Sequence, residues 1–178
     1  MNVATHSSVA SFTGRINSAP PTLCSSRSVA INPAVFGSNA RNAVTGVELS
    51  ELAVKAFFED NGLAYEHNGF VYTARDVDIT LHCGDFFGFE SEPFDAYYDR
   101  AALIALPATL RPAYARRVDE LLTPDCYRLV ITLEYDQSIV AGPPFSVPGD
   151  EVADYWPGLA RIDEKSDLEN VPPRFREA

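Results

Sequence analysis

One short run constrains the fold of this chain more than any other feature: Leu129-Val130-Ile131-Thr132-Leu133 is almost entirely apolar. A strand with one solvated face alternates apolar and polar side chains, whereas a strand buried on both faces does not. The run therefore predicts a strand inside an open α/β sheet whose two faces are covered by helices. The chain has 178 residues, of which 46% are hydrophobic, and this is enough for one domain around one core.

Strand and helix patterns alternate from about residue 43 onward. Ser50 is expected to cap a helix by accepting a hydrogen bond from a free backbone N–H, and Asn61-Gly62 to end it. The apolar residues of this helix recur at helical spacing and are expected to face the core: Leu49, Leu52, Ala53, Ala56 and Phe57. The other predicted elements are strand 43–48, a hairpin around Asn68-Gly69, strands 77–83 and 94–98, helix 112–122, strand 129–133 and a short helix 151–155.

Four of the predicted strands end in polar or charged residues. These are Glu48, Asp85, the pair Asp99-Arg100, and Glu134 with Asp136. Ligands of open α/β sheets bind beyond the carboxyl ends of the strands. We therefore expect these side chains to gather along one edge of the sheet.

Each of these side chains has both a functional and a structural interpretation. Glu48 can accept two hydrogen bonds from a ribose diol, or it is a solvated acid near a helix N-terminus. Asp85 can accept from an exocyclic amine while Phe86 or Phe87 covers an adenine ring, although at least one of the two rings is expected to lie in the core. Arg100 can bind an anionic group, or it forms a surface ion pair with Asp99.

A second motif follows the apolar strand. Gly142-Pro143-Pro144-Phe145 is followed by another rigid turn at Val147-Pro148-Gly149. An aromatic ring between two stiff turns lowers the entropy lost on ordering a flat ligand. The motif therefore predicts one wall of a binding site.

Composition argues against several classes of partner. The net charge is −11 and the pI about 4.6, so the chain has no basic surface for nucleic acid. No apolar run approaches the ~18 residues of a membrane helix. His67 and His82 lack metal-ligand spacing, which predicts no metal site. Cys24, Cys83 and Cys126 are widely spaced, which favours reduced thiols and a cytoplasmic location.

The first 42 residues differ in composition from the rest. They are rich in Ser, Asn, Ala and Pro, and residues 1–47 contain no acid. We expect 1–42 to be a divergent or disordered leader and 43–178 to be the folded domain. An organelle transit peptide is an open alternative for the leader.

Several segments together resemble the bacterial thiopurine S-methyltransferase family over about residues 43 to 176. They are VTGVELSELAVKAFFEDNGL, ITLHCGDFF, FDAYYDRAALIALP, RPAYARRVDELL and LVITLEYDQSIVAGPPFSVPGDEV. The resemblance implies a class I methyltransferase: a Rossmann-like α/β sheet with helices on both faces, here incomplete. It implies S-adenosylmethionine as cofactor and transfer of its methyl group to the sulfur of an aromatic or heterocyclic thiol. Methylation of selenium and tellurium compounds, tellurite resistance and a monomeric state are also implied.

The resemblance assigns roles to seven positions. The cofactor residues are expected to be Glu48, Asp85, Phe86 and Arg100. The acceptor residues are expected to be Arg100, Asp99, Pro144 and Phe145. It implies no catalytic side chain and no metal, because alignment of donor and acceptor carries the reaction.

The chain departs from the family pattern at both ends. The family holds the methionine end of the cofactor with a loop close to PLCGKS, and residues 22–28 here lack its Gly and Lys. The family continues past PRFREA with a further strand. A truncated or frameshifted reading is therefore expected, and an inactive remnant acting as a binding module remains an alternative. A nicotinamide oxidoreductase would need a G-x-G-x-x-G loop, which the sequence lacks.

Overall fold

The computed structural model describes residues 8–15, 27–30, 43–138 and 140–166. The chain divides into two compact units, and each is described by itself. The β3 unit comprises residues 17–98 and 117–126, and the β8 unit comprises residues 1–16, 99–116 and 127–178. Among the described residues, no helix is long and apolar enough to cross a membrane.

The β3 unit is a mixed sheet with strand order β4-β5-β6-β3-β2-β7. Its elements in chain order are β2 (Arg27–Ala30), β3 (Ala43–Glu48), α1 (Glu51–Asp60), β4 (Tyr65–Asn68), β5 (Val71–Ala74), β6 (Ile79–Cys83), the 3-10 turn η2 (Phe86–Gly88) and β7 (Phe94–Asp99). The last residue of β7, Asp99, belongs to the β8 unit. The strands predicted at 43–48, 77–83 and 94–98 are therefore confirmed as β3, β6 and β7.

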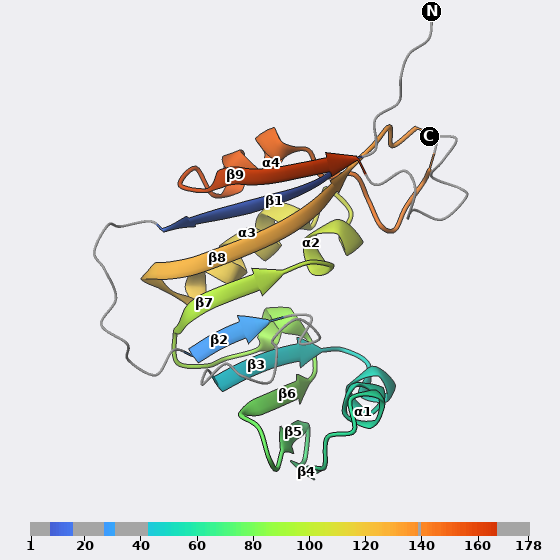
Figure 1. The fold of residues 1–178 in the computed structure, drawn as a ribbon, viewed down its shortest axis with the longest axis vertical. Coiled ribbons are helices and arrows are strands. Elements are labelled where there is room, and N and C mark those ends of the chain that lie inside the picture. Colours follow the sequence, from blue (N-terminus) through green and yellow to red (C-terminus); the bar gives the residue numbers. More distant parts are fainter. Residues whose placement is uncertain (1–7, 16–26, 31–42, 139, 167–178) are drawn as a thin grey trace, which may run out of the picture. The chain divides into compact units, whose positions relative to one another are not determined.

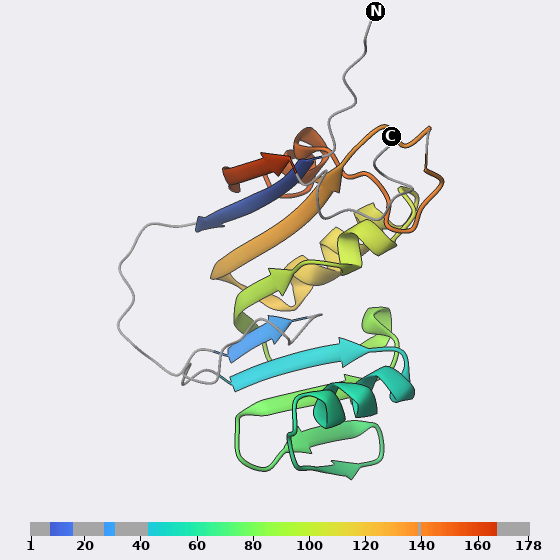
Figure 2. The same ribbon diagram turned by 45° about the vertical axis from the view of Figure 1, so that its right-hand side comes forward.

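Parallel pairing brings four strand ends to one edge of this sheet. β2 pairs in parallel with β3 on one side and with β7 on the other, and β3 pairs in parallel with β6. Their arrows point the same way in both ribbon views (Figures 1 and 2). The strands that follow β2 in the chain lie first on one side of it, as β3 and β6, and then on its other side, as β7. Open α/β sheets bind ligands beyond the strand ends at such a reversal of strand order. The predicted Rossmann-like α/β class is confirmed.

The predicted hairpin is also present, with its turn one residue later than expected. Asn68 pairs with Val71, so Gly69 and Phe70 form the two-residue turn. Gly69 has φ of +58°, and a glycine with positive φ at the first turn position is typical of a type II′ hairpin. Asn68 therefore ends β4 instead of entering the turn.

The buried face of α1 differs from the expectation. Ser50 caps the helix as predicted, accepting a hydrogen bond from Ala53 N at 3.3 Å. The side chains that enter the core are Val54 and Phe58, both fully buried, whereas Leu49 and Leu52 are 76% and 79% exposed. The expected apolar stripe was wrong for Leu49 and Leu52, whereas Phe57 is partly buried against the core as expected. Val54 and Phe58, four residues apart, face the sheet and pack with Tyr72, Ala74 and Leu81 of β5 and β6.

Within its described residues, the β8 unit has three antiparallel strands in the order β8-β1-β9. Its elements are β1 (Ser8–Arg15), α2 (Ala102–Ala105), α3 (Arg111–Glu120), β8 (Leu122–Glu134), α4 (Gly149–Tyr155) and β9 (Ala160–Ser166). The end of α3 and the start of β8, residues 117–126, belong to the β3 unit. Figure 1 shows β1 running opposite to its two neighbours.

Helix 112–122, strand 129–133 and helix 151–155 are confirmed as α3, β8 and α4, but Leu122 begins β8 instead of ending α3. β9 was missed because its sequence, ARIDEKS, is mostly charged and lacks the apolar alternation of a strand. β1 and β2 both lie within the segment expected to be a leader. The loop counterpart at 22–26 lies outside the described residues.

We predict that substitutions on the buried and exposed faces of α1 change the free energy of unfolding by different amounts. Phe58→Ala should lower the free energy of unfolding by about 3–5 kcal/mol, because it leaves a cavity against β5 and β6. Leu52→Ala, on the same helix, should change it by less than about 0.5 kcal/mol. Urea denaturation measures both, and equal losses in the two variants would contradict the assigned face.

Candidate functional site

The acids of two neighbouring strands lie at the same edge of the β3 unit. Glu48 ends β3 opposite Cys83, the last residue of β6. Gly84 N donates to the backbone oxygen of Glu48 at 2.9 Å, which ties the loop after β6 to the end of β3. Asp85 is the next residue, so the structure brings Glu48 and Asp85 together as parallel pairing predicts.

The Glu48 carboxylate is half-exposed, and only one of its two oxygens accepts a hydrogen bond within the described residues. Its Oε1 accepts a hydrogen bond from Ser50 N at 2.7 Å, just before α1. Within the described part of the chain, its second oxygen has no partner. Glu48 can therefore accept from a ligand hydroxyl while the first oxygen keeps its orientation.

Asp85 and the two rings after it form a short turn on the same edge. Asp85 Oδ1 accepts from Phe87 N at 3.0 Å and so caps η2. The rings of Phe86 and Phe87 meet edge to face, with centroids 6.1 Å apart. The expectation that one of them lies in the core is wrong: neither is buried, because η2 places both on a turn outside the sheet.

Asp99 is fully buried in the β8 unit and organises the start of α2. Its oxygens accept from Ala101 N and Ala102 N at 3.1 and 2.9 Å, and from Leu103 N at 3.2 Å. The Tyr114 hydroxyl of α3 donates to it at 2.9 Å. With an exposure of 0%, Asp99 shapes the turn that carries Arg100 instead of contacting a ligand itself.

Arg100 projects from that turn. It is exposed, and within the described part of the chain its guanidinium makes no hydrogen bond or ion pair. Such a cation is available for an anionic ligand. Glu48 and Arg100 lie in different units, so their convergence on one ligand stays a prediction.

The predicted wall is a loop whose conformation is fixed by internal hydrogen bonds. We call residues 140–147 the wall loop. The Tyr135 hydroxyl donates to Pro144 O at 2.6 Å, and Tyr135 N donates to the Ser146 hydroxyl at 3.0 Å. Gln137 accepts from Ser146 N at 2.7 Å and donates to the Tyr135 hydroxyl at 3.0 Å and to Val140 O. The backbone around Pro144 and Phe145 is therefore set before any ligand arrives.

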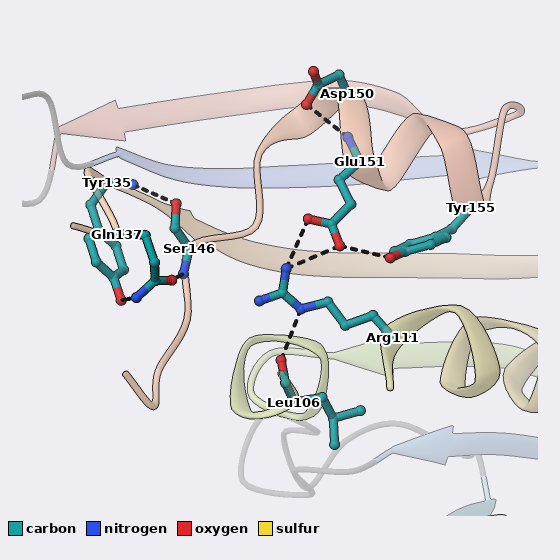
Figure 3. Close-up of polar contacts among 8 residues, drawn as sticks. All are labelled: Leu106, Arg111, Tyr135, Gln137, Ser146, Asp150, Glu151 and Tyr155. Carbon is teal, nitrogen blue, oxygen red and sulfur yellow. Dashed lines mark hydrogen bonds and ion pairs between the residues drawn. The ribbon is translucent and has the colours of Figure 1, made fainter. Parts of the chain in front are cut away.

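A second network lies beside the wall loop (Figure 3). Arg111 Nη1 donates to both oxygens of Glu151 at 3.0 and 2.9 Å, and Arg111 Nε donates to Leu106 O at 2.9 Å. The Tyr155 hydroxyl donates to Glu151 at 2.7 Å. Burial, followed by this hydrogen bond, raises the pKa of Tyr155 to about 12, so it stays protonated at neutral pH.

Sequence reasoning missed both networks. The pairs Arg111–Glu151 and Gln137–Ser146 join residues 40 and 9 positions apart, and no local pattern indicates them. One local signal was present, because Glu151 and Tyr155 are four residues apart in a predicted helix and therefore share a face.

A cavity of about 410 Å³ lies at the other edge of the β3 unit. It is lined by the start of β3, from Ala43 to Thr45, and by residues 73–80. These positions include the amino ends of β3 and β6, together with the end of the antiparallel strand β5 and the loop that follows it. Ligands of parallel sheets bind beyond the carboxyl ends, so we do not assign the cofactor to this cavity.

We predict that Asp99 stabilises the β8 unit through its hydrogen bonds at the start of α2. Asp99→Asn should lower the free energy of unfolding by about 3 kcal/mol, because an amide NH₂ replaces an acceptor that faces backbone N–H donors. Asp154→Asn, an exposed control on α4, should change it by less than about 0.5 kcal/mol. Thermal and urea unfolding measure both, and a neutral Asp99→Asn would refute the role.

We also predict that Gly142 cannot be replaced without moving Phe145. Gly142 has φ of +80°, and a Cβ there would lie 2.5 Å from Phe145 Cδ1. Gly142→Ala should therefore lower the free energy of unfolding by about 1–3 kcal/mol. Gly88→Ala meets open space and should be close to neutral, so similar losses in the two variants would contradict the packing.

Comparison with known proteins places these features in a family. The model of the thiopurine S-methyltransferase (TPMT) family matches residues 34–178. A thiopurine S-methyltransferase of Pseudomonas putida (strain KT2440) is 46% identical over 120 residues, which are 65% of this chain and 56% of that protein. One from Bordetella petrii is 43% identical over 143 residues, covering 75% and 64%.

The chain spans less than two thirds of the length of these relatives. Among solved structures, the N-methyltransferase NodS from Bradyrhizobium japonicum aligns with a TM-score of 0.45 at 16% identity, covering 59% of this chain and 51% of that one. The family match includes every candidate residue from Glu48 to Phe145. This chain belongs to the thiopurine S-methyltransferase family.

Proposed function

We propose that this protein transfers a methyl group from S-adenosylmethionine to the sulfur of an aromatic or heterocyclic thiol, such as a thiopurine. Family membership supports the reaction class. The observation that carries the proposal is the position of Glu48 and Asp85 at the carboxyl edge of two adjacent parallel strands. This edge is where a nucleoside cofactor binds in sheets of this class.

The cofactor roles follow from the free atoms at that edge. Glu48 accepts from the ribose hydroxyls with the oxygen that Ser50 leaves unused. Asp85 accepts from the adenine amine with the oxygen that does not cap η2, and Phe86 lies against the adenine ring. Bound S-adenosylmethionine supplies an activated methyl group, because its sulfur is a sulfonium.

The acceptor roles fall to residues of the β8 unit. Arg100, oriented by the Asp99 turn, pairs with the acceptor anion and lowers the pKa of its thiol. Pro144 and Phe145 provide a flat apolar surface against which an aromatic thiol stacks. Alignment of the two sulfur atoms and exclusion of water then carry the reaction, without a catalytic side chain or a metal.

The proposal extends to biological setting. We expect a monomer in the cytoplasm, with a small-molecule acceptor and no nucleic acid or membrane partner. The net charge of −11 supports the exclusion of nucleic acid and suits a cationic donor. Selenium and tellurium compounds are further acceptors, through which the protein contributes to tellurite resistance.

We predict that Glu48 carries much of the cofactor affinity. Isothermal titration with S-adenosylhomocysteine should show that Glu48→Gln raises the Kd by about 10- to 100-fold, because two charge-assisted hydrogen bonds become neutral ones. Glu59→Gln, an exposed acid on α1, should leave the Kd unchanged. Equal affinity in the two variants would overturn the assignment of Glu48.

A methylation assay on 6-mercaptopurine separates the enzyme from the alternative of a binding module. Cofactor binding together with S-methylation supports the enzyme. Acceptor binding without cofactor binding supports the binding module and contradicts the proposed reaction. Absence of binding to either compound contradicts both.

A further inference from the structure

Arg111 is a buried cation that the proposed cofactor and acceptor contacts do not use. It is the first residue of α3, and its side chain is only 4% exposed. A buried charge destabilises a fold unless it is paired and hydrogen-bonded. The partners of Arg111 therefore indicate what its position in the fold requires.

Those partners come from the elements around the wall loop. One nitrogen of the guanidinium binds the carbonyl of Leu106, at the end of α2, and another binds the carboxylate of Glu151 on α4. Figure 3 shows the guanidinium between the two, with its remaining nitrogen pointing away from α4. Tyr155 donates to the same carboxylate, which restricts Glu151 further. A single planar group thus sets the spacing of α2, α3 and α4.

Phe145 of the wall loop packs against the same guanidinium. The Arg111 Cζ lies 5.9 Å from the centroid of the Phe145 ring, within the range of a cation–π contact. Phe145 N donates to Ile104 O of α2 at 2.6 Å, so the backbone of Phe145 is tied to the helix whose end Arg111 binds. The ring also lies close to Gly142, where a Cβ would be 2.5 Å from Phe145 Cδ1.

We propose that Arg111 is a positioning residue that fixes the orientation of the Phe145 ring. The consequence for acceptor binding rests on the proposed function, in which this ring is part of the acceptor wall. A ring that is already oriented loses less freedom when a flat thiol stacks on it. Arg111 acts through Phe145, whereas the exposed Arg100 contacts the acceptor directly.

The geometry also predicts that lysine cannot replace Arg111. An ammonium group is a point donor on a flexible stem, whereas the guanidinium donates in one plane to Leu106 and Glu151 and presents a flat face to Phe145. Arg111→Lys therefore keeps the charge but loses the fixed ring. Charge alone would make the two residues equivalent.

The first test observes the ring itself. The full chain is produced with 4-fluorophenylalanine at position 145 and studied by fluorine NMR. We expect one narrow resonance in the parent protein and a broadened or split resonance in Arg111→Lys. Arg116→Gln, an exposed arginine on the same helix, is the control and should match the parent. A narrow, unshifted resonance in Arg111→Lys would overturn the proposal.

A second variant keeps the test decisive if Arg111→Lys fails to fold. Breaking one half of a buried ion pair destabilises a protein strongly, whereas replacing both halves by apolar residues of similar volume is often tolerated. The double variant Arg111→Met with Glu151→Met should therefore still fold cooperatively, with a lower unfolding midpoint than the parent because Leu106 O and the Tyr155 hydroxyl lose their partners. It should still show the broadened resonance, and a parent-like resonance in this folded double variant would also overturn the proposal.

The third measurement distinguishes positioning from general structural support. In the double variant the KM for 6-mercaptopurine should rise roughly tenfold, while the Kd for S-adenosylhomocysteine stays within about twofold. Equal losses for both ligands would show a structural role and contradict positioning. If the parent chain neither binds nor methylates 6-mercaptopurine, the proposed function fails, and the fluorine spectra still decide whether Arg111 orients Phe145.

Discussion

Parallel pairing of β3 with β6 is the constraint on which the candidate site depends. The register sets Glu48 opposite Cys83, and the backbone bond from Gly84 to Glu48 joins the next loop to the same strand end. Two acids 37 positions apart in the chain therefore share an edge. Pairing shifted by one residue would turn one acid to the other face, and the edge would lose its paired acceptors.

The β8 unit fixes its part of the site by different means. The buried carboxylate of Asp99 satisfies backbone donors at the start of α2 and a hydroxyl on α3, so the turn bearing Arg100 has little freedom. The wall loop is ordered by Tyr135, Gln137 and Ser146 without a regular element. Side-chain hydrogen bonds thus provide the rigidity that hydrogen-bonded strands provide in the β3 unit.

Much of this arrangement could be predicted from the sequence, because local patterns carry it. The end of β3 at Glu48, the cap at Ser50 and the turn glycine at Gly69 each follow from the chemistry of one or two residues. The face of α1 could not be predicted, since Leu52 and Phe58 are both apolar and only packing against β5 and β6 selects between them. The bond between Arg111 and Glu151 was out of reach because it depends on how α3 and α4 meet.

The central claim is that the cofactor binds at the carboxyl edge of β3 and β6. Amide chemical shifts recorded during titration with S-adenosylhomocysteine test it most directly. The account predicts the largest shifts at Leu49, Ser50 and residues 85–87, around the acids of that edge. Shifts confined to residues 43–45 and 75–80, which line the cavity at the opposite edge, would contradict it.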